Sequence, residues 1–350
     1  MKSKNIRRKN GLTLVSIIAG LLLAQAAQAL PVIDLGAAKG YSGFFFGNVS
    51  AASDVEGKLA VGGNLTAGFD VGYRNAFGST GPSLVVGGNI KFDAGTVYNG
   101  PAYQVDTNKT IGPGSNIPWV SNNQFKLGSA VYGGSADFSN PWGGTHWQKA
   151  SFSKQANFLD FGAAKTQLSG LSTQLSSAKA NGSWSQQGAN LLLKGDKQSD
   201  VQIFDLGSLG AIGNIQLSDI KAGAHIIINS SASHISFSGF LGGDKGNSPD
   251  LLAGSRDRLL FNLGHASTVS VDTFMNGSVL AVNAAVSGTG HLEGSLIANS
   301  LGKTANGSKL ELGYEPFTPI SPVPEPASYA LMLAGILALG LRARRSAGRA

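Results

Sequence analysis

Cysteine is absent from this sequence of 350 residues, and charged residues make up only 13% of it, about half of the usual share. Without cysteine no disulfide can hold the fold, so stability must come from apolar burial and backbone hydrogen bonds. The sequence is rich instead in glycine, with 49 residues, and 42% of its residues are apolar. This apolar share is typical of a folded chain rather than a disordered one. Together with abundant serine and asparagine, it favours a β-rich extracellular protein with many tight turns.

Basic residues are in excess only at the two ends of the chain. Residues 1–29 and 342–350 contain nine of the 27 lysine and arginine residues and no acidic residue. The remaining chain has 18 basic and 20 acidic residues, so the net charge of +7 belongs to the ends. Nucleic-acid binding requires a basic patch on the folded domain. We therefore expect no nucleic-acid partner.

Residues 1–29 have the organisation of a secretory signal peptide. A basic segment precedes the 13-residue apolar stretch Leu12–Ala24, which is shorter than the ~20 residues of a membrane span. Ala27 and Ala29 then supply the small residues of a cleavage site. We predict export through the Sec translocon and removal of residues 1–29 by signal peptidase.

The C-terminus combines three features in order. A Pro-Glu-Pro triplet is followed by the 15-residue apolar stretch Ala327–Leu341 and then by a basic cluster. The triplet consists of Pro324, Glu325 and Pro326, and the cluster consists of Arg342, Arg344 and Arg345. This arrangement resembles the PEP-CTERM sorting signal of exosortase substrates. We predict such a signal at residues 324–350, behind a Pro-rich linker at 318–323; a simple tail anchor is the alternative.

The apolar stretch before the basic cluster is short for a membrane-spanning helix. Its 15 residues would form a helix of ~22 Å against a hydrocarbon core of ~30 Å. The terminal arginines would remain on the cytoplasmic side. The resemblance implies that an exosortase-like membrane enzyme cuts near the triplet. We therefore expect a precursor anchored transiently in the inner membrane and a mature protein at the cell surface or outside the cell.

Short apolar segments closed by glycine and asparagine recur in the body of the chain. Val55–Asn64 and Ser83–Asn89 share a strand-like core followed by Gly-Gly-Asn, 25 residues apart. Gly277–Val282 and Gly294–Ala298 repeat a second core after 17 residues. Repeats at such periods predict stacked strands. We expect a mainly β fold, an irregular right-handed β-solenoid (β-helix), with a β-sandwich or jelly roll as the alternative.

In such a stack, inward-facing apolar residues of successive strands form ladders. The predicted members are Leu59, Val61, Leu84, Val86, Val279 and Leu296. The glycine pairs Gly62-Gly63 and Gly87-Gly88 are expected at corners, where positive φ angles are often needed. The continuous apolar runs Ile226–Ile228 and Leu259–Phe261 are typical of strands covered on both faces.

One segment departs from the strand pattern. Between residues 154 and 180, apolar residues recur at alternating steps of three and four, as on one face of an amphipathic helix. That face is formed by Phe161, Ala164, Leu168, Leu171, Leu175 and Ala178. Asn181-Gly182 is expected to stop the helix, and Gly162 and Gly170 weaken it by ~1 kcal/mol each. We therefore expect a helix that is stabilised by packing along the flank of the β-structure.

Four segments carry motifs that occur together in a known family. They are Ser53–Asn64, Arg258–Leu263, Gly277–Val286 and Leu292–Ala298. Together they resemble the choice-of-anchor A family, over about residues 34–317, and we assign residues 30–317 to this domain. The resemblance implies an adhesive or matrix-associated surface protein without catalytic residues, and it names no ligand.

Histidine and tryptophan offer few candidates for binding. The five histidines include no closely spaced metal-ligand pair. His225 and His234 flank a strand and a turn, and a core or surface role is the simpler interpretation. His146 lies between Trp142 and Trp147, whose rings could stack on a sugar. Packing of these tryptophans against the following helix is the favoured interpretation.

Acidic residues give one weak metal candidate. Asp54, Glu56 and Asp70 could meet as a calcium site, but their spacing lacks the order of an EF-hand loop. Nucleophile-elbow, phosphate-loop and dinucleotide motifs are all absent from the sequence. We therefore predict no catalytic, cofactor or metal site, and no enzyme.

Three functions are compatible with an exported chain of this kind. The favoured one is an adhesive or structural protein of the cell surface or biofilm matrix, with exopolysaccharide as a partner. A polysaccharide-binding or polysaccharide-active β-helix protein is the second, and cleavage would need acids gathered on one face. Ice binding is the third, and it generally needs a regular array of threonine. The available threonines, which show no steady spacing, are Thr66, Thr80, Thr96, Thr107 and Thr110.

Overall fold

The computed structural model describes residues 32–102, 125–138, 151–244, 250–320 and 335–336. Outside them lie the predicted residues Ala27, Ala29, Thr107, Thr110, Trp142, His146, Trp147, Pro324, Glu325, Pro326, Arg342, Arg344 and Arg345. Among the described residues no helix is both long enough and apolar enough to cross a membrane. The apolar stretch Ala327–Leu341 lies outside them, apart from Gly335 and Ile336.

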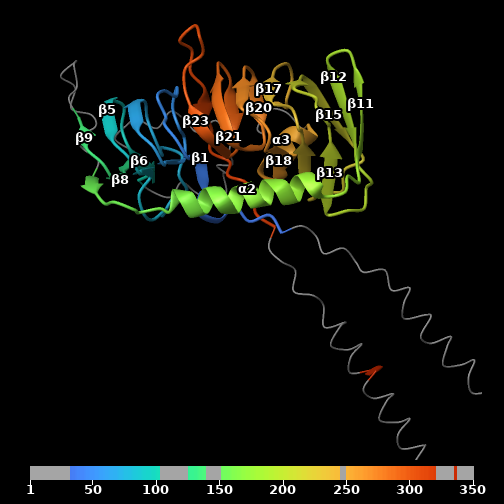
Figure 1. Ribbon diagram of the computed structural model, residues 1–350, viewed down its shortest axis with the longest axis horizontal. Helices are drawn as coiled ribbons and strands as arrows, with labels where there is room; N and C mark the ends of the chain where they lie inside the picture. The colour runs from blue at the N-terminus through green and yellow to red at the C-terminus, as the bar shows by residue number, and fades with distance from the viewer. Residues whose placement is uncertain (1–31, 103–124, 139–150, 245–249, 321–334, 337–350) are drawn as a thin grey trace, which may run out of the picture. The chain divides into compact units, whose positions relative to one another are not determined.

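The fold is mainly β, and most of its strands pair in parallel. The largest sheet contains ten strands in a continuous parallel order, which we call the helix-covered sheet. The order is β10 (Ser151–Lys154), β8 (Ser129–Tyr132), β4 (Leu84–Val86), β2 (Lys58–Val61), β1 (Tyr41–Phe45), β23 (Leu296–Leu301), β21 (Ser278–Gly288), β18 (Leu259–Asn262), β16 (His225–Asn229) and β13 (Val201–Asp205). The helix α2 (Phe161–Ser177) packs along the outer face of this sheet (Figure 1).

The helix-covered sheet is the first of three series of parallel strand pairs. The second series contains β14 (Ala211–Ile212), β17 (His234–Phe237), β19 (Thr268–Val271), the second halves of β21 and β23, β3 (Leu65–Gly68), β5 (Ile90–Ala94) and β9 (Ala136–Asp137). The third series contains β20 (Phe274–Asn276), β22 (His291–Glu293) and β24 (Glu311–Leu312), and single bridges extend it through Val55, Val71 and Val97.

The remaining elements are short. They are the antiparallel pair β6 (Tyr98–Pro101) and β7 (Phe125–Leu127), the hairpin β11 (Ser183–Gln187) and β12 (Asn190–Lys194) with β15 (Asn214–Ser218), the helix α3 (Leu251–Ser255), and the 3₁₀ turns η1 (Gly36–Ala38) and η4 (Arg256–Arg258).

The predicted apolar ladders are confirmed as register partners. Leu59 pairs with Leu84, Val61 with Val86, and Val279 with Leu296. All six side chains are at most 1% exposed. The sequence repeats of 25 and 17 residues therefore correspond to neighbouring parallel strands of one sheet.

Glycine is needed at the predicted corners for a different reason than the one we expected. Neither glycine pair has a positive φ angle. A Cβ atom on Gly63 would lie 2.5 Å from Oδ1 of Asn48, and one on Gly88 would lie 2.6 Å from Oδ1 of Asn64. These same oxygens accept hydrogen bonds from the backbone N–H groups of Asn64 and Asn89, at 2.8 and 2.9 Å. Close stacking of an asparagine ladder, not a left-handed backbone, therefore requires glycine.

The predicted helix is present as α2, but it is shorter at both ends than the interval 154–180. It begins after Asp160, whose Oδ1 accepts the N–H of Ala163 at 2.9 Å and so caps the helix. Of the residues expected at its start, Lys154 ends β10, and residues 155–160 form neither helix nor strand. It ends before Ala178, which is extended, ahead of the predicted stop at Asn181. Of the predicted face, Ala164, Leu168, Leu171 and Leu175 are buried, and Phe161 and Ala178 pack against the same core.

The helix-covered sheet is buried on both faces, as its continuous apolar runs predict. In Ile226–Ile228 and Leu259–Phe261 the middle residue belongs to the core under α2, and the two outer residues belong to the inner core between the series. These strands therefore join the two apolar cores of the fold.

Buried polar groups fix the position of α2 on the sheet. Asn262 donates from Nδ2 to the carbonyl of Ser172 at 3.0 Å and accepts from the Ser172 hydroxyl at 2.6 Å. Its neighbour Asn229 donates to the carbonyl of Leu175 at 2.9 Å, and Asn262 also donates to Asn229 at 2.8 Å. Because buried polar groups are costly when unpaired, this network favours one register of the helix.

The order of strands reverses once along the chain. The sheet grows from β1 to β10 in one direction, the chain then passes through α2 and the β11–β12 hairpin, and the sheet grows back from β13 to β23. As a result β1 lies between β2 and β23, with Gly43 paired to both Leu59 and Leu296. The early and late parts of the domain are therefore direct neighbours.

Candidate functional site

The exposed face of the second series presents two rows of mostly small side chains. Exposed or half-buried residues alternate with buried ones along β17, β19 and the second half of β21. One row of register partners is His234, Thr268, Ala285 and Ser300, and the other is Ala211, Ser236, Ser270 and Ser287. We call these two rows the hydroxyl face. Parallel strands place members of one row about 4.8 Å apart, and two residues along a strand separate the rows by about 7 Å.

The hydroxyl face lines an open groove with a volume of about 970 Å³. Asn48, Asn299 and Lys303 also line it. The ring nitrogen Nδ1 of His234 lies 2.8 Å from the hydroxyl of Thr268. None of the described residues that line the groove is acidic or is a tryptophan, tyrosine or phenylalanine. The groove thus offers hydroxyl and amide groups and almost no charge.

The two histidines singled out in the sequence do not meet. His234 belongs to the hydroxyl face, whereas His225 packs against the ring of Phe317 and contacts the carbonyl of Thr318 through Nε2 at 2.9 Å. Burial lowers the pKa of His225, which favours its neutral form. The structure therefore gives these two histidines no shared site.

The regular hydroxyl array escaped the sequence reasoning because the search considered threonine alone. Thr66 is exposed on β3, and Thr96 is buried beside the third series, so these threonines share no row. The array consists mainly of serines, and three of them lie between buried residues, in Ile235–Phe237, Val269–Val271 and Val286–Gly288. A search for serines between apolar residues would have found these three.

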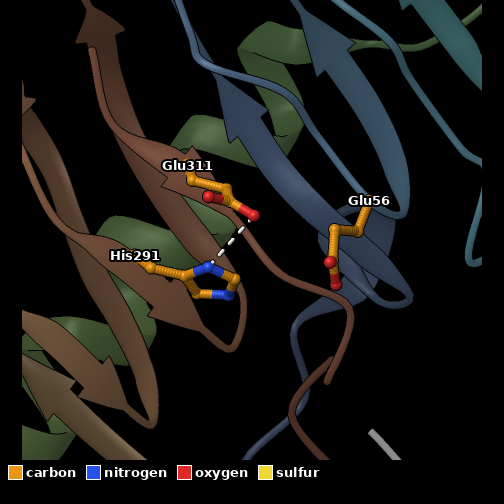
Figure 2. A group of neighbouring side chains, drawn as sticks. All are labelled: Glu56, His291 and Glu311. Atoms are coloured by element: carbon orange, nitrogen blue, oxygen red, sulfur yellow. Dashed lines mark ion pairs between the residues drawn. The ribbon is translucent and has the colours of Figure 1, made fainter. Parts of the chain in front are cut away.

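A second candidate site is a cluster of charged side chains on the third series. His291 and Glu311 are register partners, and Nδ1 of His291 lies 3.1 Å from Oε1 of Glu311 (Figure 2). The other ring nitrogen, Nε2, lies 3.3 Å from Oε1 of Glu293. One ligand atom from each of Glu56, His291 and Glu311 lies within 4.8 Å of the other two. This group is a candidate metal centre.

The suggested calcium trio is brought together only in part. The hydroxyl of Tyr73 lies 3.1 Å from Oδ2 of Asp54 and 3.2 Å from Oε1 of Glu56, so these two carboxylates share a donor. Asp70 instead accepts the backbone N–H of Thr96 at 2.7 Å. Asp70 is not a member of the candidate metal centre.

Two arginines balance part of the negative charge in this cluster. Arg74 pairs with Glu56. Arg256 is fully buried, and its Nε lies 3.0 Å from Oε2 of Glu315. Its Nη1 lies 3.7 Å from Oε1 of Glu293. The carboxylates of Glu56, Glu293 and Glu315 are thus each paired with an arginine.

Burial and charge shift the pKa values in the cluster. Burial, with the carboxylates of Glu311 and Glu56 nearby, raises the pKa of Asp54 to about 7. Burial alone would lower the pKa of His291, but Glu293 and Glu311 outweigh it and raise that pKa to about 10. The contact with His291 in turn holds the pKa of Glu311 below its usual range. The imidazole of His291 therefore retains a proton at neutral pH, where Asp54 is only partly ionised.

Comparison with known proteins gives two family matches. Residues 34–311 match the model of a putative ice-binding-like adhesive domain, and residues 322–346 match the PEP-CTERM protein-sorting motif, which confirms the predicted sorting signal. No curated protein matches the chain significantly. The crystal structure of an ice-binding protein from the Antarctic ascomycete Antarctomyces psychrotrophicus is similar over 81% of this chain and 98% of that chain, at 9% identity and a TM-score of 0.28.

Proposed function

The chain belongs to the family of putative ice-binding-like adhesive domains, and from this premise we propose that it is an adhesin of the cell surface or extracellular matrix. The PEP-CTERM motif implies an exported protein whose membrane-anchored precursor is processed by exosortase. The single observation that carries the proposal is the hydroxyl face with its open groove. Attachment through this face, to exopolysaccharide or another matrix polymer, is the proposed function.

The repeating geometry of the hydroxyl face suits a repeating partner. Each serine or threonine hydroxyl both donates and accepts a hydrogen bond. Each such bond contributes only about 0.5–1.5 kcal/mol, so useful affinity requires many of them in register with the partner. An extended polymer or an ordered surface meets this requirement better than a small molecule does. The absence of carboxylates among the groove's described lining residues favours binding over cleavage, and we propose that the protein is not an enzyme.

Ice is the second candidate partner, and the two straight rows of small side chains favour it specifically. Rows related by strand pairing keep a constant spacing, and an ordered solid surface presents the same kind of two-dimensional regularity. Five of the eight members of the rows are serine or threonine, and two more are alanine. Ice and matrix polymer would bind the same face, so one measurement with each partner is needed to tell them apart.

We also propose the finer fold and family assignment. Three series of parallel pairs, linked by single strands that run from one series into the next, support an irregular right-handed β-solenoid, because crossover connections between parallel strands are almost always right-handed. Sandwiches and jelly rolls pair their strands mainly in antiparallel fashion. The choice-of-anchor A resemblance rests on motifs that lie in and beside β2, β18, β21 and β23.

Replacing Ser270 with lysine is expected to reduce attachment by at least about tenfold. The substitution removes a central hydroxyl and places a long charged side chain over neighbouring Ser236 and Ser287 in the row, and a loss of 1.4 kcal/mol corresponds to a tenfold change. Two probes are measured: retention on matrix polysaccharide extracted from the producing cells, and thermal hysteresis with single ice crystals. Retention alone would identify polymer as the partner, and hysteresis alone would identify ice.

The matched control for this substitution is Ser185→Lys on β11. Ser185 is also an exposed strand serine, but it lies in another sheet. The control is expected to behave as the unmodified protein with both probes. Equal attachment by Ser270→Lys and Ser185→Lys would remove the hydroxyl face from the proposal.

Deleting residues 324–350 is expected to move the protein from the membrane fraction to the soluble fraction. The deletion removes the apolar stretch and the arginines that retain the precursor. For the protein without this deletion, mass spectrometry of the processed form is expected to show a first residue at Leu30 and a last residue near Pro324–Pro326. Arg349→Gln, which leaves the basic cluster in place, is the control. Recovery of the native protein from the cytosol with both ends intact would contradict export and sorting.

A further inference from the structure

The candidate metal centre is assembled from distant parts of the chain. His291 lies in β22, Glu311 lies in β24, and Glu56 lies just before β2. Figure 2 shows the carboxylate of Glu56 facing His291 and Glu311 across a short gap. The three possible ligand atoms lie within 4.8 Å of one another, and Glu56 is only 5% exposed. An ion at this point would therefore be held by three protein ligands from three segments.

A buried carboxylate oxygen beside this group has no hydrogen-bond partner. The side chain of Glu293 is 4% exposed, and its Oε2 accepts no hydrogen bond from any described residue. Leaving a buried charged oxygen unsatisfied is costly. Oε2 of Glu293 is thus a third oxygen, and a fourth ligand atom, beside the group formed by Glu56, His291 and Glu311.

Glycine at position 313 lets two of these side chains lie directly against the backbone. A Cβ atom on Gly313 would lie 2.4 Å from Oε2 of Glu293 and 2.8 Å from Nε2 of His291. Gly313 has no positive φ angle, so the backbone conformation does not require glycine there. Any side chain at position 313 would therefore displace Glu293 and His291 from their present positions.

The charge of the cluster also calls for a cation. Four carboxylates, Glu56, Glu293, Glu311 and Glu315, and the partly ionised Asp54 face three positive groups. These are the arginines Arg74 and Arg256 and the protonated imidazole of His291, so a net negative charge remains. Charges at such depth interact strongly because little water screens them. A divalent ion among the three carboxylates nearest to His291 would bring the cluster closer to balance.

We propose that Glu56, His291 and Glu311, with Glu293 as a fourth ligand, form a binding site for Zn²⁺. The imidazole nitrogen distinguishes this donor set from a calcium site, which uses six to eight oxygen ligands. Zinc accepts imidazole nitrogen and carboxylate oxygen together in a four-coordinate tetrahedron. Zinc binds only a deprotonated ring nitrogen, so its binding releases to solvent the proton that His291 otherwise holds. With bonds of about 2.0–2.2 Å, the outermost ligand atoms must approach by roughly 1 Å, which side-chain rotation can supply.

Zinc at this site would stabilise the contact between the early and late parts of the domain. Its ligands join the segment before β2 to β22 and β24, which are late in the chain. An ion that binds only the folded state stabilises it in proportion to the logarithm of its concentration. The site is therefore structural and lies apart from the hydroxyl face. The proposal of zinc binding does not depend on the proposed adhesive function.

Zinc is expected to raise the melting temperature of the purified full-length protein, prepared without a histidine tag and stripped with a chelator. At 100 times the dissociation constant the shift should be roughly 5 °C. Glu311→Gln and His291→Gln are each expected to weaken zinc binding at least about tenfold, measured by calorimetric titration. Ca²⁺ at the same concentration should give a much smaller shift.

Two further variants make the outcome decisive. His265→Gln removes an exposed histidine elsewhere and is expected to bind zinc as the unmodified protein does. Gly313→Ala displaces Glu293 and His291 and is expected to abolish binding. Absence of a zinc shift in the unmodified protein, full binding by His291→Gln, equal loss with His265→Gln, or a larger shift with Ca²⁺ than with Zn²⁺ would each overturn the proposal.

Discussion

Replacing Arg256 with alanine is expected to lower the free energy of unfolding by about 3–5 kcal/mol. Its guanidinium group is fully buried, with Glu315 at 3.0 Å and Glu293 at 3.7 Å. Both of these carboxylates are at most 4% exposed. Without the arginine they stay buried and lose their nearest permanent positive charge. Urea unfolding followed by circular dichroism measures the effect.

Arg258→Ala is the matched control for this prediction. Arg258 lies two residues further along and pairs with Asp257 at 3.0 Å, but both side chains are about one-quarter to one-third exposed. Partly exposed ion pairs contribute about 0–1 kcal/mol because water screens them. A loss below about 1 kcal/mol for Arg256→Ala, or equal losses for the two variants, would contradict the role assigned to Arg256.

Replacing Leu168 with alanine is expected to lower the free energy of unfolding by about 2–5 kcal/mol. Leu168 is fully buried in the core between α2 and the helix-covered sheet, where it belongs to one cluster with Phe44, Leu280 and Ile297. Truncation removes apolar contacts and leaves a cavity, because the polar network at Asn229 and Asn262 holds the helix in place. The shift of the urea unfolding midpoint relative to the unmodified protein reports the loss, provided that the slope of the unfolding free energy against urea concentration is the same for both proteins.

Gln174→Ala controls for changes to the helix itself. Gln174 is an exposed residue of α2, and alanine favours the helix, so stability should change by less than about 0.5 kcal/mol. If Leu168→Ala proved as mild as Gln174→Ala, the helix would not depend on its contact with the sheet. The sequence argument that its two glycines must be offset by packing would then fail as well.

Local sequence patterns predicted the presence of helix and strands well, and the residues at which they begin and end less well. The face of α2 was predictable because every third or fourth residue of Ala164–Leu175 is apolar. Its start was placed too early, although Asp160 is a recognisable capping residue. The glycine corners were located correctly, but the reason lay in neighbouring strands. Only the structure shows that the side chain of Asn48 occupies the space that a side chain at position 63 would need.

The two candidate sites were predictable to different degrees. The hydroxyl face follows in part from short motifs such as Val269–Val271, so a broader search of the sequence would have found three of its serines, though not their alignment into one row. The metal centre was beyond such reasoning. Asp54 and Glu56 drew attention as acids, but nothing near them in the sequence points to His291 or Glu311.

The sequence by itself determined the sorting motif at the end of the chain, the buried strands and the buried face of the helix. Each of these depends on residues that are close in sequence, because apolar periodicity and short signals act locally. Only the tertiary structure decided that β1 lies between β2 and β23, after the chain has crossed the sheet through α2. Backbone hydrogen bonds form equally well between any two strands, so they do not select which strands become neighbours. The neighbours of a strand are set by how the whole chain packs its apolar core. That closure, and no local pattern, sets Glu56 beside His291 and Glu311.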